Sequence, residues 1–424
     1  MLASLDIRLW LLAGACAAIA GFWLLLLGSR RRNPPVMLRA IDDFAAALPS
    51  IAGITRGSIC EGNVVEILQD GDGFFPVLLR DIGEARHSIH LETYVWGGGE
   101  IARRVGEALA ARARDGIEVR VLVDALGAHT RDRDLFAAMQ KAGCQVAVYC
   151  PLWPQNIRRW NHRSHRKLFI ADGRVGMVFG HGIDEKWSGH AQDRNHYRDT
   201  ALRVVGPAVH ALQSVFTENW IEETGELTLG DEYFPPAEQA GKARAHVVSS
   251  SSTEAVSSVA LVYGIAIASA RREVIIQNPY FVPRWDVVEL MAQRIRDGVT
   301  IRLMLPGNNT DHALIRHAGH YLVRGMLECG VHVYEYDRTL IHQKIMIVDG
   351  TWAHVGSTNF DARSLELNEE VSIGVIDETV AAALEAAFEA DRKHARELTL
   401  AGWSRRTRWH RAMDAIAYRI RDQL

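Results

Sequence analysis

Lysine is scarce in this chain, and positive charge is not in excess. Only six of the 424 residues are lysines, and 48 Lys+Arg face 51 Asp+Glu. The chain therefore lacks the global basic field that drives binding to nucleic acid, which argues against a nuclease and predicts no nucleic-acid partner. Its length is ample for a buried core, in two or three domains or in one large two-lobed unit.

Cysteine is also rare. The five cysteines form no C-x-x-C pair and no dense framework of the kind that staples small secreted domains. A disulfide scaffold and a cysteine-based metal site are therefore not indicated. The pattern is typical of free thiols in a reducing compartment.

One long apolar run stands near the N-terminus. Residues 9–28 carry no charge, and twenty helical residues span about 30 Å, the thickness of a bilayer core. A cleaved signal peptide is the alternative, but no A-x-A site follows the run. We expect residues 1–35 to be a retained transmembrane anchor. The arginines at 30–32 then predict a single-pass membrane protein with the rest of the chain on the cytoplasmic side.

The rest of the chain contains a long internal repeat. Three segments of the first half recur in the second half in the same order: ARHSIHLETY (85–94), RDGIEVRVLVD (114–124) and KAGCQVAVY (141–149) match ARREVIIQNPY (270–280), RIRDGVTIRLMLP (294–306) and ECGVHVYEY (328–336). Helical stretches that alternate with short Val/Ile-rich runs predict an α/β sandwich built twice. We expect two homologous lobes related by a pseudo-twofold axis.

The composition gives approximate limits for these lobes. The segment 221–246 is rich in Gly, Pro and acidic residues and is typical of a linker, so we place the lobes at 36–232 and 245–400. The tail, 401–424, has apolar residues at helical spacing among arginines. It predicts a basic amphipathic helix, which lies either on anionic lipid or against its own protein.

Two of the six lysines belong to a repeated motif. HRKLFIAD (165–172) and HQKIMIVD (342–349) share the pattern H-x-K-x-x-x-x-D, and random placement would produce that pattern about 0.015 times. On an extended strand the His and Lys side chains of one motif project to the same face. An imidazole beside an ammonium suits a phosphate, because the cation holds the oxygens while the imidazole attacks phosphorus or moves a proton.

The pseudo-twofold axis would bring the two motifs together. Two histidines would then lie on opposite sides of one phosphorus with two lysines beside it. One histidine could act as the nucleophile and the other as the general acid for the leaving alkoxide, the in-line geometry that displacement at a phosphodiester requires. The spacing alone does not decide which histidine has which function.

These motifs resemble those of the phospholipase D superfamily, and the fuller match is to the bacterial cardiolipin synthases. The resemblance covers roughly residues 60–400 and includes HLETYVW (90–96), HYRDTALRVVGPAV (196–209), NPYFVP (278–283), LPGNNTDH (305–312) and GSTNFDARSLELNEE (356–370). It implies phosphatidyl transfer through a phosphohistidine, without metal or cofactor. The expected substrate is phosphatidylglycerol, two molecules of which give cardiolipin and glycerol.

The resemblance also implies the site residues. The expected catalytic residues are His165, Lys167, Asp172, His342, Lys344 and Asp349, with Ser357 and Asn359 binding phosphate. Each histidine is expected to be oriented by a carboxylate, Glu370 for His342 and Asp199 for His165. The first lobe has Gly182 where the second has Asn359, so the half-sites differ. On the resemblance and this asymmetry we expect His165 to be the nucleophile.

Other functions share these residues. A phospholipase D that releases phosphatidic acid would use the same phosphohistidine with water as the acceptor. A soluble nuclease and a non-catalytic lipid-binding protein are less consistent with the anchor and with two complete motifs. The sequence leaves the acceptor and the oligomeric state open. The loop 151–163 contains two Trp and either meets lipid headgroups or is an ordinary surface loop.

Overall fold

The computed structural model describes residues 10–19, 21, 44–254 and 256–421. Residues 10–19 are helical, but most of the expected anchor at 9–28 lies outside the described residues. Among the residues described, no helix has the length and apolar character needed to cross a bilayer.

The predicted duplication is visible in the order of elements. The first half contains α2 (Phe44–Ile54), β1 (Ile59–Gln69), α3 (Asp70–Glu84), β2 (Ser88–Thr93), α4 (Glu100–Arg114), β3 (Glu118–Asp124), α5 (Arg133–Lys141), β4 (Gln145–Tyr149), the 3-10 helix η1 (Pro154–Arg159), β5 (Leu168–Ala171), β6 (Val175–Phe179), the 3-10 helix η2 (Glu185–Trp187), β7 (Thr200–Val205) and α6 (Ala208–Thr224). The second half contains β8 (Ala243–Ser250), α7 (Ser258–Ser269), β9 (Glu273–Gln277), α8 (Trp285–Arg296), β10 (Thr300–Pro306), α9 (Ala313–Cys329), β11 (His332–Tyr336), β12 (Ile345–Val348), β13 (Trp352–Gly356), α10 (Ala362–Glu366), β14 (Glu370–Ile376) and α11 (Glu378–Arg392). The short strand β15 (Ala395–Glu397) and the helices α12 (Leu400–Ser404) and α13 (Arg408–Arg419) follow.

The strands form one continuous sheet with two equivalent halves. Its order is β15-β11-β10-β9-β12-β13-β14-β8-β1-β7-β6-β5-β2-β3-β4, and β1 pairs with β8 in antiparallel fashion at the centre. Outward from this junction, one half continues through β7, β6, β5, β2, β3 and β4 and the other through β14, β13, β12, β9, β10 and β11. The equal order on both sides is the arrangement that a duplicated lobe predicts.

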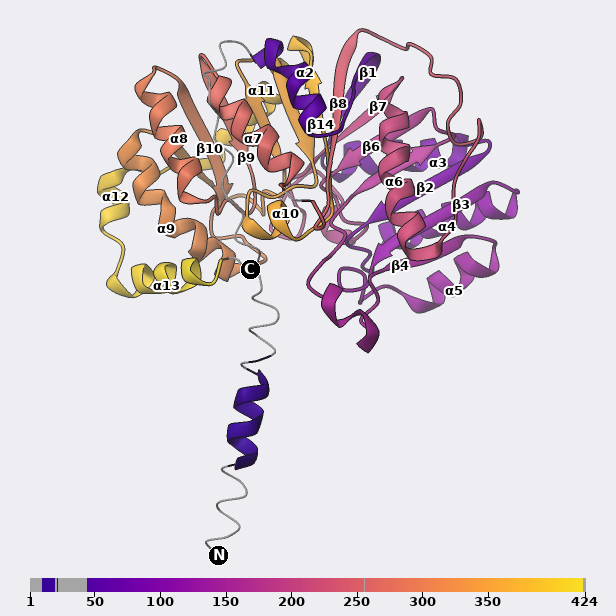
Figure 1. The fold of residues 1–424 in the computed structure, drawn as a ribbon. Helices are drawn as coiled ribbons and strands as arrows, with labels where there is room; N and C mark the ends of the chain where they lie inside the picture. The colour runs from indigo at the N-terminus through magenta and orange to yellow at the C-terminus, as the bar shows by residue number, and fades with distance from the viewer. Residues whose placement is uncertain (1–9, 20, 22–43, 255, 422–424) are drawn as a thin grey trace, which may run out of the picture.

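Helices cover both faces of the sheet (Figure 1). One apolar core packs α3, α4 and α5 against the first half, and another packs α2, α7, α8 and α9 against the second. A third core is shared by α6 and α11 and includes buried residues of strands from both halves, such as Leu202 and Val355. The two lobes are thus joined by a continuous apolar layer as well as by the sheet.

Strand pairing places both motifs at the same edge of the sheet. Leu168, the first residue of β5, pairs with Glu92 near the carboxyl end of β2, and Ile345, the first residue of β12, pairs with Gln277 at the end of β9. The His-x-Lys segments come just before these strands, in extended chain, and not within them. They therefore lie beyond the carboxyl ends of the parallel strands, where open α/β sheets bind ligands.

Two symmetric backbone contacts hold the His segments against the opposite lobe. Ser164 forms an isolated parallel bridge with Glu369, and Ile341 forms one with Arg198. The N–H of His165 donates to the carbonyl of Glu369 at 2.9 Å, and that of His342 donates to the carbonyl of Arg198 at 2.7 Å. Each motif histidine is therefore positioned by backbone from the other half.

The expected linker and tail are refined by the structure. Helix α6 continues to Thr224 and β8 begins at Ala243, so the connection is 225–242, shorter than 221–246. The tail forms α12 and α13, and α13 packs against α9, with Ala417 buried beside Ala318. One face of the amphipathic tail thus lies against its own protein, while Trp409 on α13 is 71% exposed.

Candidate active site

The two motif histidines are each held by a buried carboxylate of the opposite lobe. Nδ1 of His165 lies 2.9 Å from Oε1 and 3.1 Å from Oε2 of Glu370, and Nδ1 of His342 lies 2.7 Å from Oδ2 of Asp199. The expected pairing, Glu370 with His342 and Asp199 with His165, is wrong because the two pairs cross. The backbone bridges explain the crossing, since each His segment runs beside the strand start that carries the other lobe's carboxylate.

This contact defines the protonation of the two imidazoles. A carboxylate only accepts hydrogen bonds, so each Nδ1 carries the donated proton and each Nε2 keeps its lone pair. Near the Nε2 of His342 lies the ammonium of Lys344, at 3.1 Å. Burial lowers the pKa of His165 to about 4, with Glu370 opposing the shift and Lys167 adding to it. Burial and then Lys344 lower the pKa of His342 well below its usual value. Both imidazoles are therefore neutral near pH 7 and suited to nucleophilic attack.

The two motif lysines are buried beside these histidines. The ammonium of Lys167 donates to the carbonyl of His165 at 3.0 Å, and that of Lys344 donates to the carbonyl of His342 at 2.5 Å. Burial lowers the pKa of Lys167 to about 7 and that of Lys344 to about 8, and the nearby carboxylates of Glu370 and Asp199 oppose this shift. The carboxylates do not fully offset the cost of burying the two positive charges, so binding of an anion between the ammonium groups would be favoured.

The carboxylates are themselves held by different donors in the two lobes. Ser357 Oγ donates to Oε2 of Glu370 at 2.5 Å, so this expected phosphate ligand instead fixes the carboxylate. Asp199 receives a side-chain donor from Trp187, whose indole Nε1 lies 3.0 Å from Oδ2, and a backbone donor from the N–H of Thr200, 2.8 Å from Oδ1. Sequence reasoning missed Trp187. Its only signal is the pair of glycines, Gly180 and Gly182, that stand where the second lobe has Ser357 and Asn359.

Asn359 lies buried beside this arrangement. Its side-chain oxygen has no hydrogen-bond partner among the described residues. A buried polar atom without a partner is costly unless a ligand or water satisfies it. This agrees with the expected role in phosphate binding, and the amide can turn to present either its oxygen or its nitrogen.

The motif aspartates are not brought to the histidines. Asp172 accepts hydrogen bonds from the backbone N–H groups of Arg86, His87 and Ser88 at 2.7 to 2.9 Å, at the far end of β5. Asp349 accepts the equivalent three bonds before β9, from Arg271, Arg272 and Glu273. Their φ angles are +55° and +54°, a left-handed conformation that Asp tolerates. These contacts indicate a structural function, not the expected catalytic one.

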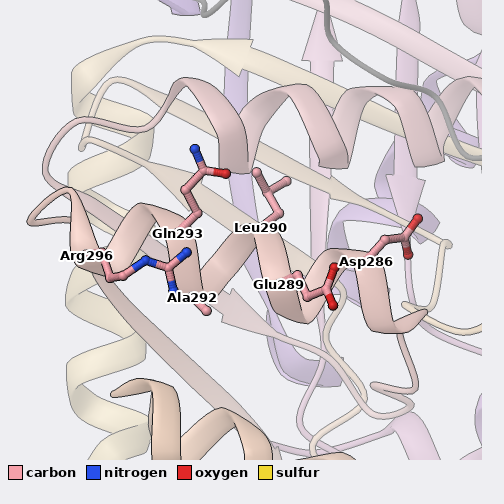
Figure 2. A pocket seen from close by; sticks show the side chains of 6 residues that line it. All are labelled: Asp286, Glu289, Leu290, Ala292, Gln293 and Arg296. Carbon is pink, nitrogen blue, oxygen red and sulfur yellow. The ribbon is translucent and has the colours of Figure 1, made fainter.

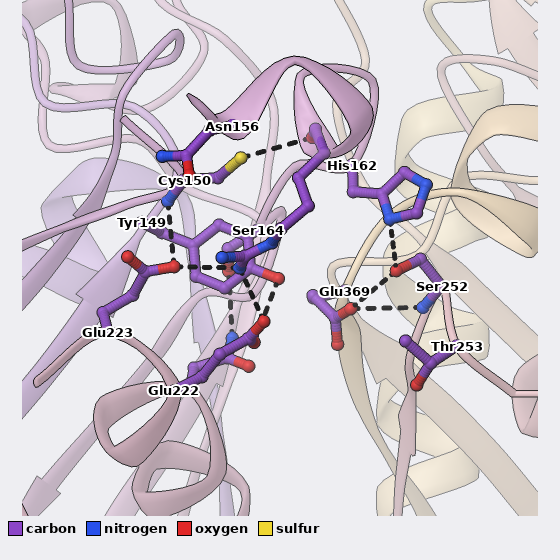
Figure 3. A network of polar contacts seen from close by, with 12 residues as sticks. Tyr149, Cys150, Asn156, His162, Ser164, Glu222, Glu223, Ser252, Thr253 and Glu369 are labelled. Carbon is purple, nitrogen blue, oxygen red and sulfur yellow. Dashed lines mark hydrogen bonds and ion pairs between the residues drawn. The ribbon is translucent and has the colours of Figure 1, made fainter. Parts of the chain in front are cut away.

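The loop that leads into His165 is tied to both lobes (Figure 3). The N–H of Cys150 donates to Glu223 of α6 at 3.1 Å. On the opposite side, His162 Nδ1 lies 2.9 Å from Ser252 Oγ, and the N–H of Ser252 donates to Glu369 at 3.1 Å. The loop 151–163 is therefore part of the scaffold of the site, although its Leu152 and Trp153 side chains are exposed.

Two other features of the structure do not belong to this site. A hollow on α8 is lined by Asp286, Glu289, Leu290, Ala292, Gln293 and Arg296, none of which is a predicted site residue (Figure 2). His317, His320 and Asp414 bring ligand atoms within 4.8 Å of one another. However, Asp414 of α13 already pairs with His317 of α9 at 2.7 Å and with Arg406 at 2.6 Å, so these groups join α13 to α9.

Comparisons with known proteins agree with this geometry. The family model described as a cardiolipin synthase, phospholipase D-like domain matches residues 78–220 and 264–392, so it contains both His-x-Lys motifs. The major cardiolipin synthase ClsA of Bacillus subtilis (strain 168) is 34% identical over 361 residues, which cover 84% of this chain and 74% of that protein. The chain belongs to the cardiolipin synthase family.

Further relatives give the same result. The cardiolipin synthase of Listeria monocytogenes serotype 4b (strain CLIP80459) is 32% identical over 85% of this chain and 75% of its own length. Among solved structures, the phosphatidylserine synthase of Haemophilus influenzae Rd KW20 has a TM-score of 0.64 at 12% identity and covers 88% of this chain and 97% of its own. That likeness shows that this cardiolipin synthase family member shares its fold with that structure.

Proposed function

We propose that the protein transfers a phosphatidyl group from one phosphatidylglycerol to another through a phosphohistidine, giving cardiolipin and glycerol. The observation that carries the proposal is the crossed pair of buried His–carboxylate contacts, flanked by two buried lysines. Family membership supports the choice of phosphatidylglycerol.

The first half-reaction forms the covalent intermediate. Nε2 of His165 attacks phosphorus, and the bond from phosphorus to the headgroup glycerol oxygen breaks. The bound anionic phosphodiester offsets the charge of Lys344 and raises the pKa of His342, so Nε2 of His342 takes up a proton from water before the reaction. His342 then gives this proton to the glycerol oxygen as it leaves. Lys167, Lys344 and the Asn359 amide hold the non-bridging oxygens.

The second half-reaction reverses these steps. His342, now neutral, takes the proton from a headgroup hydroxyl of a second phosphatidylglycerol. The resulting alkoxide oxygen attacks phosphorus, the bond to His165 breaks, and cardiolipin leaves. Glu370 and Asp199 each accept from the Nδ1–H of their histidine throughout, which stabilises the charged imidazole forms.

The test is to supply phosphatidylglycerol labelled in its headgroup glycerol, in mixed micelles, and to identify every product. One glycerol should be released for each cardiolipin formed, and a chelator should have no effect. Phosphatidic acid as the sole lipid product would show that water is the acceptor and that the protein is a hydrolase. Addition of phosphatidylethanolamine would reveal a mixed donor through the release of ethanolamine.

The roles of the two histidines have their own test. After an acid quench with labelled lipid donor, the variant His342→Ala should retain a little covalent label when the leaving group needs no proton. The variant His165→Ala should carry none. The reverse pattern would exchange the two roles without affecting the overall reaction.

We also infer that residues 9–28 anchor the protein in the inner membrane by a single span, with the catalytic lobes in the cytoplasm. The uncharged run and the arginines at 30–32 support this placement. Deletion of residues 1–33 should release the protein from integral association with membranes and leave activity on micelles. Digestion of the catalytic lobes by protease added outside intact cells would refute the orientation.

A further inference from the structure

The two half-sites of this protein can be compared position by position. In the first lobe, Gly180 and Gly182 stand eight and ten residues after Asp172. In the second lobe, Ser357 and Asn359 stand at the same distances after Asp349. The register is the same in both lobes, since Ile183 and Phe360, the next residues, form equivalent isolated bridges with Trp96 and Phe281. The half-site that holds His165 to Glu370 thus has a hydroxyl and an amide where the other has two glycines.

The first glycine makes room for the carboxylate. A Cβ at Gly180 would lie 2.2 Å from Oδ1 of Asp199, so no side chain fits there while Asp199 is in place. In the second lobe this position is Ser357, and its hydroxyl donates to Glu370. Asp199 therefore cannot receive its donor from the equivalent position and must receive it from elsewhere.

The second glycine makes room for Trp187. A Cβ at Gly182 would lie 2.8 Å from Cζ3 of the Trp187 ring. The ring thus stands against the position that carries the amide side chain in the other lobe, and its Nε1 donates to Oδ2 of Asp199 at 3.0 Å. This is the same oxygen that receives Nδ1 of His342 at 2.7 Å. The tryptophan replaces the missing hydroxyl as the donor to the carboxylate.

Trp187 is also held firmly and contacts the imidazole directly. Its ring meets that of His342 edge to face, with centroids 5.2 Å apart, and meets Tyr197 in the same way at 4.9 Å. The backbone N–H of Trp187 donates to Asp184 at 3.0 Å within η2. A Cβ on Gly71 would lie 2.1 Å from the Trp187 carbonyl oxygen, so α3 packs closely against this residue.

We propose that Trp187 is a positioning residue of the His342 half-site, which fixes Asp199 through its indole N–H and replaces the Ser357 function of the other half-site. The indole N–H only donates, so the Asp199 oxygen that it contacts is held as an acceptor. Asp199 in turn keeps the Nδ1–H tautomer of His342, whose Nε2 then handles the proton of the headgroup oxygen. The consequence for turnover rests on the proposed function.

The experiment compares Trp187→Phe with Trp96→Phe. Trp96 is a matched control, because it is buried in the same lobe and its Nε1 has no partner in the part of the chain that the structure describes. Both variants lose ring volume, but only Trp187→Phe loses a donor to a charged group. That variant should lower kcat roughly 10- to 100-fold with KM changed by less than about threefold. Trp96→Phe should lose a similar amount of stability and retain its kcat.

Two readouts separate positioning from a packing defect. In a double-mutant cycle with Asp199→Asn, Trp187→Phe should add little further loss, because its function acts through that carboxylate. The ¹⁵N resonances of the His342 ring, assigned with His342→Ala, should report mixed tautomers in Trp187→Phe, while those of His165 stay unchanged. Equal kcat losses in both Phe variants, full additivity with Asp199→Asn, or an unchanged His342 ring would each overturn the proposal. The ring resonances need no lipid, so they test Trp187 even if wild type forms no cardiolipin.

Discussion

Oε1 of Glu370 lies 2.9 Å from Nδ1 of His165, although 205 residues of chain separate the two and they belong to different lobes. Glu370 is fully buried, and burial alone would raise its pKa. The neighbouring His165 acts in the opposite direction, and the pKa of Glu370 is lowered overall. The carboxylate thus stays ionised beside its imidazole. The orientation of the expected nucleophile therefore depends on a residue that follows the second motif.

Replacement of this carboxylate is the first prediction. Glu370→Gln keeps the size of the side chain but removes the charge, so the Nδ1–H tautomer of His165 loses its preference. We expect kcat to fall by about 10²- to 10⁴-fold, as for other carboxylate-oriented histidines. The ¹⁵N resonances of His165 should change while those of His342 do not, and Asp199→Asn should give the converse. A response of His342 to Glu370→Gln would contradict the crossed pairing.

A second prediction concerns Ser357, which was expected to bind phosphate and which instead donates to Glu370. Ser357→Ala should lower kcat about tenfold, and the loss of a buried hydrogen bond to a charged group should cost about 1.5–3 kcal/mol of unfolding free energy. Ser372→Ala is the control, because this buried hydroxyl on the same sheet contacts Thr358 and neither carboxylate. A rise in KM without loss of kcat in Ser357→Ala would restore the phosphate-binding role.

The third prediction is an alkaline decline in kcat/KM. Lys167 and Lys344 bind the anionic phosphate only when protonated, and burial lowers their pKa values to about 7 and about 8. Since kcat/KM reports the free enzyme, it should fall as pH rises through this range. Replacement of the exposed Lys141 by Ala should leave the profile unchanged. A flat profile from pH 7 to 10 would show that both ammonium groups keep ordinary pKa values.

The contribution of the same lysines to stability should change in the opposite direction. Their folded-state pKa values lie below the ordinary value of 10.5. Between about pH 7 and 10.5 the unfolded chain therefore binds more protons than the folded chain, so their contribution to the unfolding free energy rises with pH. Denaturant unfolding of wild type and of Lys167→Met should differ in this slope. Activity and stability should thus separate in alkaline solution.

The motif aspartates give the fourth prediction. Asp172→Asn preserves the shape and tolerates the left-handed backbone, but it weakens an acceptor of three N–H groups. The unfolding free energy should fall by about 1–3 kcal/mol. The kcat per folded molecule, titrated by the burst of covalent intermediate, should stay within about twofold of wild type. Asp115→Asn, at an exposed pair with Arg112, should change neither. A loss as large as that of His165→Ala would make Asp172 catalytic.

Much of the fold was predictable from the sequence. Two matched series of Val/Ile-rich runs predicted the duplicated α/β lobes, because a fully buried strand such as β12 needs a continuous apolar segment. The sequence also predicted that the His and Lys side chains of each motif lie together, since alternate residues of an extended chain project to the same face.

The pairing between lobes was not predictable in this way. Which carboxylate faces which histidine is set by docking, and Asp199 and Glu370 follow their own lobe's motif at comparable separations. Trp187 escaped notice for another reason. An indole donor belongs to no spacing pattern, and its function follows only from the space that Gly180 and Gly182 leave.

The crossed contacts also bear on the time at which the chain becomes reactive. When the ribosome adds His165 to the chain, the carboxylate and the carbonyl that orient it are still more than 200 residues from being synthesised. A nascent or truncated chain that ends before Glu369 therefore contains His165, the proposed nucleophile, without the carbonyl and the carboxylate that orient it. We therefore expect His165 to become oriented for reaction only after the second lobe has been synthesised and has docked, and we expect the first lobe alone to be inactive.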